Sequence, residues 1–512
     1  MKSLYVFFLA LLNSMALSAQ PGIQWQKCIG GTDYDQANVI QQATDGGYVV
    51  AGITFSDDGD IESLNGLVDY YIVKLNSVGS IEWTKTLGGS NDDRAYSIRQ
   101  TSDGGYIVAG FTQSNDGDVF GFHGDKDAWV VKLNGFGVIE WQRSLGGIGW
   151  DEAWSAIETA DNGYAIAGRS NSTDGDATEN HGFLDFWIVK LTSSGIIEWQ
   201  KSIGGSNDDI ARSIKQTSDG GYIVAGSTKS TDGDVSMNNG NVDFWVVKLG
   251  PMGELQWENA LGGTGADYAS DIIEISDGYI GCGYTGSHNT GDVTGHQGVL
   301  DYWIVKLTKA GDLVWQKTYG GSDGDWGRSI IQTSDGMYVV AGETKSKNGD
   351  VVGNNGIQVA WVLKLDTLGG LIWKRPLGGT QGEAGLSIVE TNDYGLALAG
   401  YAWSNNGDVS GNHGEQDMWI VKLSPETISS TQSPLTPLSI FPNPAHTSIT
   451  LQIPTPESTL HVSINDLLGR TLSQQTITNG GQIDIAALPT GLYLLSATTE
   501  AGEVYVGKLR KE

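Results

Sequence analysis

The sequence predicts an all-β protein, namely a seven-bladed β-propeller followed by a small C-terminal β-sandwich. The first observation is a tryptophan that recurs every 58 residues, each time five residues before a Gly-Gly pair: Trp25, Trp83, Trp141, Trp199, Trp257, Trp315 and Trp373. A second aromatic ladder keeps the same step: Tyr71, Trp129, Trp187, Trp245, Trp303, Trp361 and Trp419. The third is the phrase DGGYIVAG at 103–110, which occurs in seven exact or approximate copies along the chain, this one included. A fixed period of this length indicates a repeat architecture.

Each repeat contains four runs of strand length. In residues 199–254 these are IEWQKSI, ARSIKQT, GYIVAGST and DFWVVKL, which are rich in Val, Ile, Trp and Tyr. Turns of Ser, Asp, Gly and Pro bound each run, and no helical periodicity competes. Four antiparallel strands repeated seven times are typical of the blades of a β-propeller.

The two ends of the array predict how the last blade is completed. The first strand-like run, 23–27, has the pattern of an outer strand, and the last, 418–423, has the pattern of the strand that precedes an outer strand. We therefore expect the N-terminal strand to complete the last blade, so that the propeller (20–424) has no open sheet edge.

Residues 1–19 have the pattern of a cleaved secretory signal peptide. Lys2 precedes an apolar run at 4–12, and small residues end the segment at Ser18 and Ala19. The apolar run is too short to cross a bilayer, and no other stretch of the sequence is long and apolar enough. We expect a secreted chain without a transmembrane segment. The two cysteines, Cys28 and Cys282, are expected to be buried and unpaired.

The composition changes after the array. Residues 425–437 are rich in Ser, Thr and Pro without periodicity, which predicts a linker. Residues 438–512 contain short alternating segments such as SITLQI, HVSIND and LYLLSATT, which predict a small antiparallel sandwich.

The last 75 residues also match a known pattern. The phrases IFPNPAHTSITLQI, INDLLGRTL and LPTGLYLLSATTEAGEVYVGKLRK follow one another in the order found in the C-terminal sorting domain of type IX secretion cargo, and the tail resembles that family of the Bacteroidetes. The matching residues are Pro442, Asn443, Pro444, Gly469, Arg470, Gly491, Tyr493 and Lys508. The propeller resembles the glycine-rich propellers attached to such tails. The resemblance implies export through the type IX secretion machinery and release or display at the outer-membrane surface.

The charge balance limits the partners. The chain has 60 acidic and 30 basic side chains, a formal net charge of −30. Phosphate backbones require a basic surface, so nucleic acid is excluded as a partner. We expect a monomer that is kept soluble by its acidic surface.

The longer loops contain repeated acidic phrases. An Asp-Gly-Asp or Asn-Gly-Asp triplet recurs in six of the seven repeats. Closely spaced carboxylates and carbonyls can supply the oxygen ligands that calcium requires. The spacing differs from the twelve-residue calcium loop, and Asp before Gly also forms self-bonded turns. Calcium in these loops is therefore one hypothesis and a structural turn the other, with four candidate ligands: Asp116, Asp118, Asp232 and Asp234.

Four tryptophans lie outside both ladders, namely Trp150, Trp154, Trp326 and Trp403. Three of them stand beside the acidic loop after Gly-Gly, and Trp403 follows a GYIVAG-type strand. We expect all four toward the loop-rich face, where exposed aromatics would bind sugar rings or a protein partner. The alternative is local packing under the longer loops.

The favoured function is a secreted or cell-surface binding protein for a glycan or a protein. No catalytic residue is assigned, because the sequence has no His-acid-Ser set, and enzyme activity is left uncertain. The alternative is a glycan-degrading hydrolase, endoglucanase-like, which would use two carboxylates. The candidates for that pair are Asp151, Glu152, Asp209 and Asp325.

Overall fold

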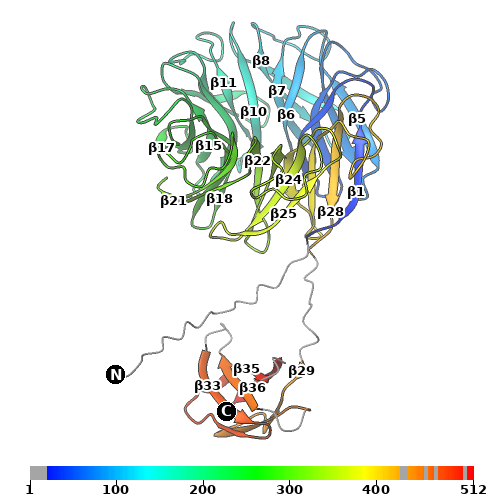
Figure 1. The fold of residues 1–512 in the computed structure, drawn as a ribbon. Helices are drawn as coiled ribbons and strands as arrows, with labels where there is room; N and C mark the ends of the chain where they lie inside the picture. The colour runs from blue at the N-terminus through cyan, green and yellow to red at the C-terminus, as the bar shows by residue number, and fades with distance from the viewer. Residues whose placement is uncertain (1–19, 427–435, 455–458, 466–470, 500–503) are drawn as a thin grey trace. The chain divides into compact units, whose positions relative to one another are not determined.

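The computed structural model describes residues 20–426, 436–454, 459–465, 471–499 and 504–512. The predicted signal peptide and most of the predicted linker lie outside these ranges. The described residues form strands β1 to β36 and contain no helix (Figure 1). Within the same ranges, no helix has the length and apolar character needed to span a membrane.

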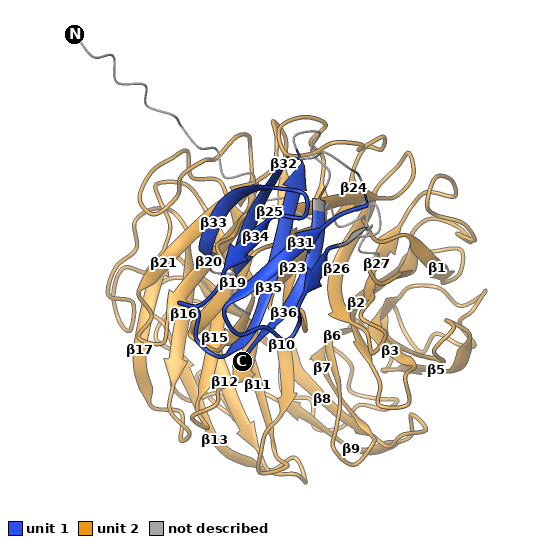
Figure 2. Ribbon diagram, turned by 90° about the horizontal axis from the view of Figure 1, so that it is seen from below, with its two compact units in different colours: residues 1–19, 428–512 blue, residues 20–427 orange. Residues whose placement is uncertain are grey.

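Seven four-stranded antiparallel sheets make up residues 20–427, and Figure 2 shows them following one another around one axis. The first three are β2 (Asp35–Gln42), β3 (Tyr48–Thr54), β4 (Asp69–Leu75) and β5 (Ile81–Leu87); β6 (Asp93–Gln100), β7 (Tyr106–Thr112), β8 (Asp127–Leu133) and β9 (Ile139–Leu145); β10 (Asp151–Glu158), β11 (Tyr164–Ser170), β12 (Asp185–Leu191) and β13 (Ile197–Ile203). The next three are β14 (Asp209–Gln216), β15 (Tyr222–Thr228), β16 (Asp243–Leu249) and β17 (Leu255–Leu261); β18 (Asp267–Ile275), β19 (Gly278–Thr285), β20 (Asp301–Thr308) and β21 (Leu313–Tyr319); β22 (Asp325–Gln332), β23 (Tyr338–Thr344), β24 (Val359–Leu365) and β25 (Leu371–Leu377).

The last sheet joins the two ends of the propeller. It consists of β26 (Glu383–Glu390), β27 (Leu396–Ala402) and β28 (Asp417–Leu423), with the N-terminal β1 (Ile23–Ile29) paired to β28. Side chains of β27 and β28 share one apolar cluster with side chains of β2, β3 and β4 in the first sheet. The pairing of β1 with β28 is the one that the repeat pattern predicted.

The two middle strands of each sheet form the core. Every residue of β7 and of β8 is buried, because neighbouring sheets cover both of their faces. The aromatics of the second ladder lie on the third strands, where Trp129 and Trp245 are completely buried. Cys28 and Cys282 are buried and free, as predicted.

The tryptophans of the series that starts at Trp25 lie on the outermost strands, and we call them the outer ladder. They connect neighbouring sheets. Trp25 of β1 lies against the turn after β4, where Gly79 has φ of +82°. A methyl group on Gly79 would lie 2.9 Å from Trp25 Cε3, and the same relation recurs between Gly137 and Trp83. The turn glycine therefore provides a left-handed backbone and leaves room for the indole of the neighbouring sheet.

The innermost strands are connected by hydroxyl groups. Ser97 of β6 accepts a hydrogen bond from Ala156 N of β10 at 3.1 Å. Ser387 of β26 accepts one from Ile40 N of β2 at 3.2 Å, which links the last sheet to the first. These bonds satisfy buried amides and fix each inner strand against its neighbour.

The C-terminal part is a second compact unit, formed by two small sheets around one apolar core. One sheet has the order β29-β36-β35-β32-β33 and the other β30-β31-β34. The strands are β29 (Thr436–Pro437), β30 (Ser439–Phe441), β31 (Ser448–Gln452), β32 (Thr459–Asn465), β33 (Thr471–Thr478), β34 (Gln482–Asp484), β35 (Gly491–Thr499) and β36 (Val504–Lys511).

Two of the predicted sorting residues make specific contacts in this unit. Asn443 Nδ2 donates to Lys508 O at 2.6 Å, and Asn443 Oδ1 accepts from Arg510 N at 2.9 Å, so this side chain holds β36. Tyr493 donates its hydroxyl to Pro489 O at 2.6 Å. Gly469 and Arg470 lie outside the described residues.

Candidate functional site

A bulge interrupts each innermost strand at its fourth residue. In β6, for example, Ala95 pairs with Gly110 and Ser97 pairs with Ala109, so that Tyr96 has no partner on β7. A bulge redirects its side chain and often occurs beside active sites. Gly110, the last residue of the DGGYIVAG phrase, faces the bulge, and a Cβ there would collide with Arg94 O. The repeated glycine therefore permits the bulge.

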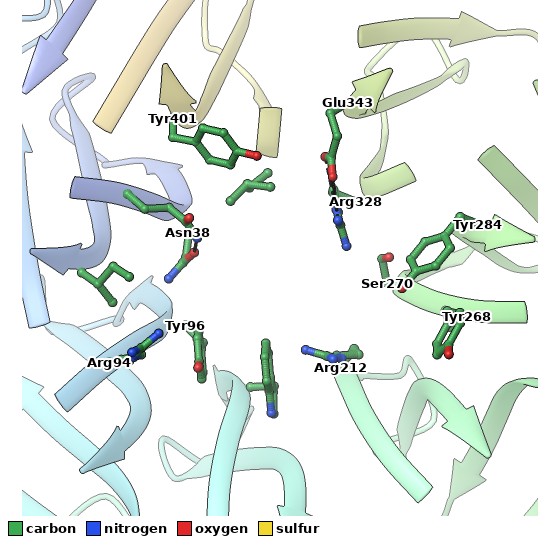
Figure 3. Close-up of a pocket in the computed structure, with 15 residues that line it drawn as sticks. Asn38, Arg94, Tyr96, Arg212, Tyr268, Ser270, Tyr284, Arg328, Glu343 and Tyr401 are labelled. Atoms are coloured by element: carbon green, nitrogen blue, oxygen red, sulfur yellow. Dashed lines mark hydrogen bonds and ion pairs between the residues drawn. The ribbon is translucent and has the colours of Figure 1, made fainter. Parts of the chain in front are cut away.

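The seven bulge residues all line one cavity of about 550 Å³ among the innermost strands (Figure 3). They are 58 residues apart and differ from repeat to repeat: Asn38, Tyr96, Trp154, Arg212, Ser270, Arg328 and Leu386. We call this cavity the axial pocket. Its size lies in the range of about 300–1,000 Å³ that is typical of small-molecule sites.

Three bulge residues form a stack on one wall of the axial pocket. The rings of Tyr96 and Trp154 lie 4.0 Å apart and are parallel within 2°. The guanidinium carbon of Arg212 lies 3.7 Å from the centre of the same indole. Two groups this close to the ring centre would overlap if they lay on the same face. Tyr96 and Arg212 therefore cover the two opposite faces of the indole. Trp154 therefore fixes Arg212 by a cation–π contact rather than offering a free face to a ligand.

Two other arginines of the pocket are neutralised by carboxylates. Arg328 donates to Glu343 Oε1 at 2.6 Å, and Glu343 is buried. Arg94 makes two hydrogen bonds to Asp92, at 2.7 and 2.9 Å. Bidentate pairs of this kind hold each guanidinium in one orientation.

Arg212 differs from Arg94 and Arg328 in its partners. Among the described residues it has no carboxylate partner and donates no hydrogen bond; its contact is with the face of Trp154. Burial, and after it the positive charges of Arg169 and Arg328, lower the pKa of Arg212 to about 10. Five N–H donors on a buried cation are thus available to a ligand, and an anion there would relieve the unbalanced positive charge.

The wall next to Arg212 is aromatic. Tyr268 and Tyr284 stack at 4.9 Å, and the guanidinium of Arg328 lies 5.6 Å from the ring of Tyr284. The hydroxyl of Tyr401 lies 3.0 Å from Gln358 Nε2, which donates to it. Figure 3 shows Tyr268 and Tyr284 on the side of the cavity next to Arg212, and Tyr401 across the cavity from it.

The four tryptophans outside the ladders do not form one cluster. Trp154 lies in the axial pocket, and Trp150 is 42% exposed, with Lys126 Nζ 5.0 Å and the Arg169 guanidinium carbon 5.9 Å from its ring centre. Trp326 lies under Lys345, and Trp403 meets Tyr34 edge-on at 5.0 Å. Over the described ranges, no ring contact joins any two of the four.

The aspartates proposed as calcium ligands bond to backbone amides. Asp116 Oδ1 accepts from Ser90 N at 2.7 Å, and Asp232 Oδ1 accepts from Ser206 N at 2.8 Å. Asp118 and Asp234 bond the first glycine of each Gly-Gly pair, at 3.3 and 3.2 Å. The part of the chain that the structure describes contains no group of three or more His, Cys, Asp or Glu side chains placed to hold a metal. Calcium binding stays a prediction.

The carboxylates named for a hydrolase lie outside the axial pocket. Asp151, Asp209 and Asp325 are completely buried, and each accepts a hydrogen bond from a serine hydroxyl at 2.7–2.8 Å. Glu152 is 1% exposed and binds Arg169 Nη2 at 2.9 Å. These contacts hold the loops and strands of the propeller.

The fold and the pocket define a propeller-type protein with a ligand-sized cavity among its innermost strands. Residues 439–512 match the family described as the secretion system C-terminal sorting domain. The resemblance of the tail is thereby confirmed. The chain thus carries a type IX sorting tail, which indicates a secreted or cell-surface protein of the Bacteroidetes.

Other similarities are more distant. The regulatory protein FlaEY of Caulobacter vibrioides is 26% identical over 146 residues, which are 26% of this chain and 15% of that protein, so the chain spans a small part of that relative's length. Among solved structures, the extracellular domain of a Bacteroides thetaiotaomicron protein described as a hybrid two-component system aligns with 93% of this chain and 69% of its own, at 12% identity and a TM-score of 0.30. Sqt1 from Chaetomium thermophilum aligns with 79% of this chain and 100% of its own, at 10% identity and a TM-score of 0.40. An α-L-arabinofuranosidase from Fusarium graminearum aligns with 79% of this chain and 98% of its own, at 10% identity and a TM-score of 0.38.

Arg212, Tyr96 and the pocket tyrosines were not predicted from the sequence. The glycine inside each GYIVAG-type strand was a usable signal, because an interior glycine indicates a bulge in the paired strand. The residue at that bulge is one of the inner-strand positions whose side chain changes between neighbouring repeats.

Proposed function

We propose that this secreted or surface protein is a binding propeller whose axial pocket holds a small saccharide with a carboxylate group. The observation that carries the proposal is the guanidinium of Arg212, which is fixed on Trp154 without an anionic partner among the described residues. A carboxylate matches the planar guanidinium with two parallel hydrogen bonds.

The rest of the pocket fits the remainder of such a ligand. Tyr268 and Tyr284 supply an aromatic wall for the apolar face of a sugar ring. Asn38 and Ser270 supply polar groups for its hydroxyls. The net charge of −30 repels anions at long range, but at physiological salt this repulsion is screened beyond about 8 Å. Binding then depends on the contacts inside the pocket.

The proposal differs from a glycan or protein site on the acidic loop face. Trp154, one of the four aromatics named for that site, supports the axial pocket, while Trp150, Trp326 and Trp403 lie apart from one another. A hydrolase has no comparable support, because Asp151, Asp209 and Asp325 are buried away from the pocket.

The test is calorimetric titration of the full-length protein with D-galacturonate and D-glucuronate, with D-galactose and D-glucose as neutral controls. A uronate should bind and the neutral sugars should not. Arg212→Gln should weaken binding roughly 10- to 100-fold, since a charge-assisted hydrogen bond contributes about 1.5–3 kcal/mol. Lys201→Gln, on the outer strand β13, is the matched control and should leave binding unchanged. Equal affinity for uronate and neutral sugar, or no effect of Arg212→Gln, would exclude the proposal.

A further inference from the structure

A second cluster of aromatic and basic groups surrounds Trp150. The indole is 42% exposed and immediately precedes β10. Lys126 Nζ lies 5.0 Å from the ring centre, and the guanidinium carbon of Arg169 lies 5.9 Å from it. We call Trp150, Lys126, Arg169 and Glu152 the Trp150 cluster.

The cluster has more positive than negative charge. Glu152 is 1% exposed, and its carboxylate contacts Lys126 Nζ at 3.4 Å and Arg169 Nη2 at 2.9 Å. Two cations are thus held by one buried acid, which leaves one positive charge beside a half-exposed indole. The chain as a whole has twice as many acids as bases.

The Trp150 cluster adjoins the axial pocket. Trp150 and Trp154 are four residues apart along extended chain, which corresponds to roughly 13 Å. Arg169 lies between the two sites: it contacts Trp150, and its charge acts on both Tyr96 and Arg212 of the pocket wall. One pyranose ring is too short to reach both sites, whereas a short oligosaccharide spans them.

We infer that the Trp150 cluster is a second subsite, in which Trp150 stacks on a further sugar ring and Lys126 and Arg169 bind its carboxylate. The inference rests on the proposed function and specifies its ligand as an oligosaccharide with at least two acidic units. An acidic peptide shares the charge but lacks the rigid ring that an exposed indole stacks against. The saccharide is therefore the ligand that the cluster fits better.

The test compares mono-, di- and trigalacturonate binding to the full-length protein by calorimetry. We expect affinity to rise at least 10-fold between the monomer and the trimer. Trp150→Ala should remove this gain and leave monomer affinity within 2-fold of the wild type, because Trp150 does not line the axial pocket. Trp326→Ala, which removes another indole lying under a lysine, is the control and should keep the gain.

Each other outcome is decisive. Monomer binding without a gain in length, or a gain that survives Trp150→Ala, overturns the second subsite and leaves the axial pocket intact. Hexa-aspartate that binds as tightly as trigalacturonate and depends equally on Trp150 overturns the saccharide assignment. No binding of any galacturonate overturns this inference, and if D-glucuronate does not bind either, the proposed function falls with it.

Discussion

Val359 and Glu383 flank Gly378 at one junction between sheets of the propeller, where other junctions place two aspartates around the equivalent glycine. A methyl group on Gly378 would lie 3.2 Å from Val359 Cγ1 and would collide with Glu383 Oε2. At Gly204, the corresponding neighbours are Asp185 Oδ1 at 2.8 Å and Asp209 Oδ2 at 2.6 Å. The junction with one carboxylate thus has the longer acid.

Restoring a second acid at this junction should destabilise the propeller. Val359→Asp would put a second carboxyl beside Glu383, and both positions are buried. We expect a loss of about 3 kcal/mol in the free energy of unfolding at pH 8 and a smaller loss at pH 5, where one carboxyl is protonated. Urea unfolding at the two pH values measures it. The control, Val359→Ala, should lose about 1–3 kcal/mol of unfolding free energy at both pH values. If Val359→Asp lost the same amount at pH 8 and at pH 5, the repulsion between the two carboxylates would not be the cause.

The paired aspartates predict how stability varies with pH. Burial raises the pKa of Asp69 and of Asp301 to about 7, and that of Asp185 to about 6. A pKa that is higher in the folded state than in the unfolded state stabilises the protein below the unfolded value of about 4. This stabilisation is lost as the pH rises through 6 to 7.

We therefore expect the melting temperature of the propeller to fall between pH 5 and pH 8, as followed by circular dichroism. Asp69→Asn keeps an acceptor for Asn65 N, which bonds Asp69 Oδ2, but cannot ionise. The variant should therefore show a shallower decrease. A profile that is flat over this range, or one that is equally steep in the variant, would show that the junction carboxylates do not control it.

Two glycines with the same backbone conformation allow the cost of backbone strain to be measured apart from the cost of a steric clash. Gly79 and Gly104 have φ of +82° and +84°. A methyl group on Gly104 meets no atom within 4 Å, whereas one on Gly79 lies 2.9 Å from Trp25. Gly104→Ala should cost about 1–2 kcal/mol of backbone strain, and Gly79→Ala about 2–5 kcal/mol because the indole must also move. Urea unfolding measures the loss in free energy of unfolding for both variants. Equal losses would contradict the close packing of the outer-ladder indole on Gly79.

The fold was predictable because burial repeats with the sequence. Trp129, Trp187 and Trp245 come at one phase of the 58-residue period, and the structure places all three on third strands with neighbouring sheets on both faces. The antiparallel pairing of β1 with β28 followed from the same phase argument. Turn chemistry fixed the ends of the strands, since glycines such as Gly79 occupy left-handed positions.

The site was less predictable because it depends on departures from the repeat. Trp154 was assigned to the loop face from its neighbours Asp151 and Glu152, but the bulge at the fourth residue of β10 turns it into the axial pocket. The same reasoning treated Asp151 as a loop acid, although the strand begins there and the residue is buried. Arg212 was overlooked because its partner, Trp154, belongs to another repeat.

The Tyr96–Trp154–Arg212 stack predicts that the indole acts on the ligand through Arg212. Trp154→Ala should weaken galacturonate binding by about as much as Arg212→Gln, because the guanidinium loses the surface that orients it. The double variant should then bind no more weakly than either single one, since groups that act as a unit are not additive. Trp154→Phe keeps an aromatic face between Tyr96 and Arg212 and should restore most of the affinity. Calorimetric titration of the four proteins measures these relations, and additive losses would mean that Trp154 contacts the ligand independently of Arg212.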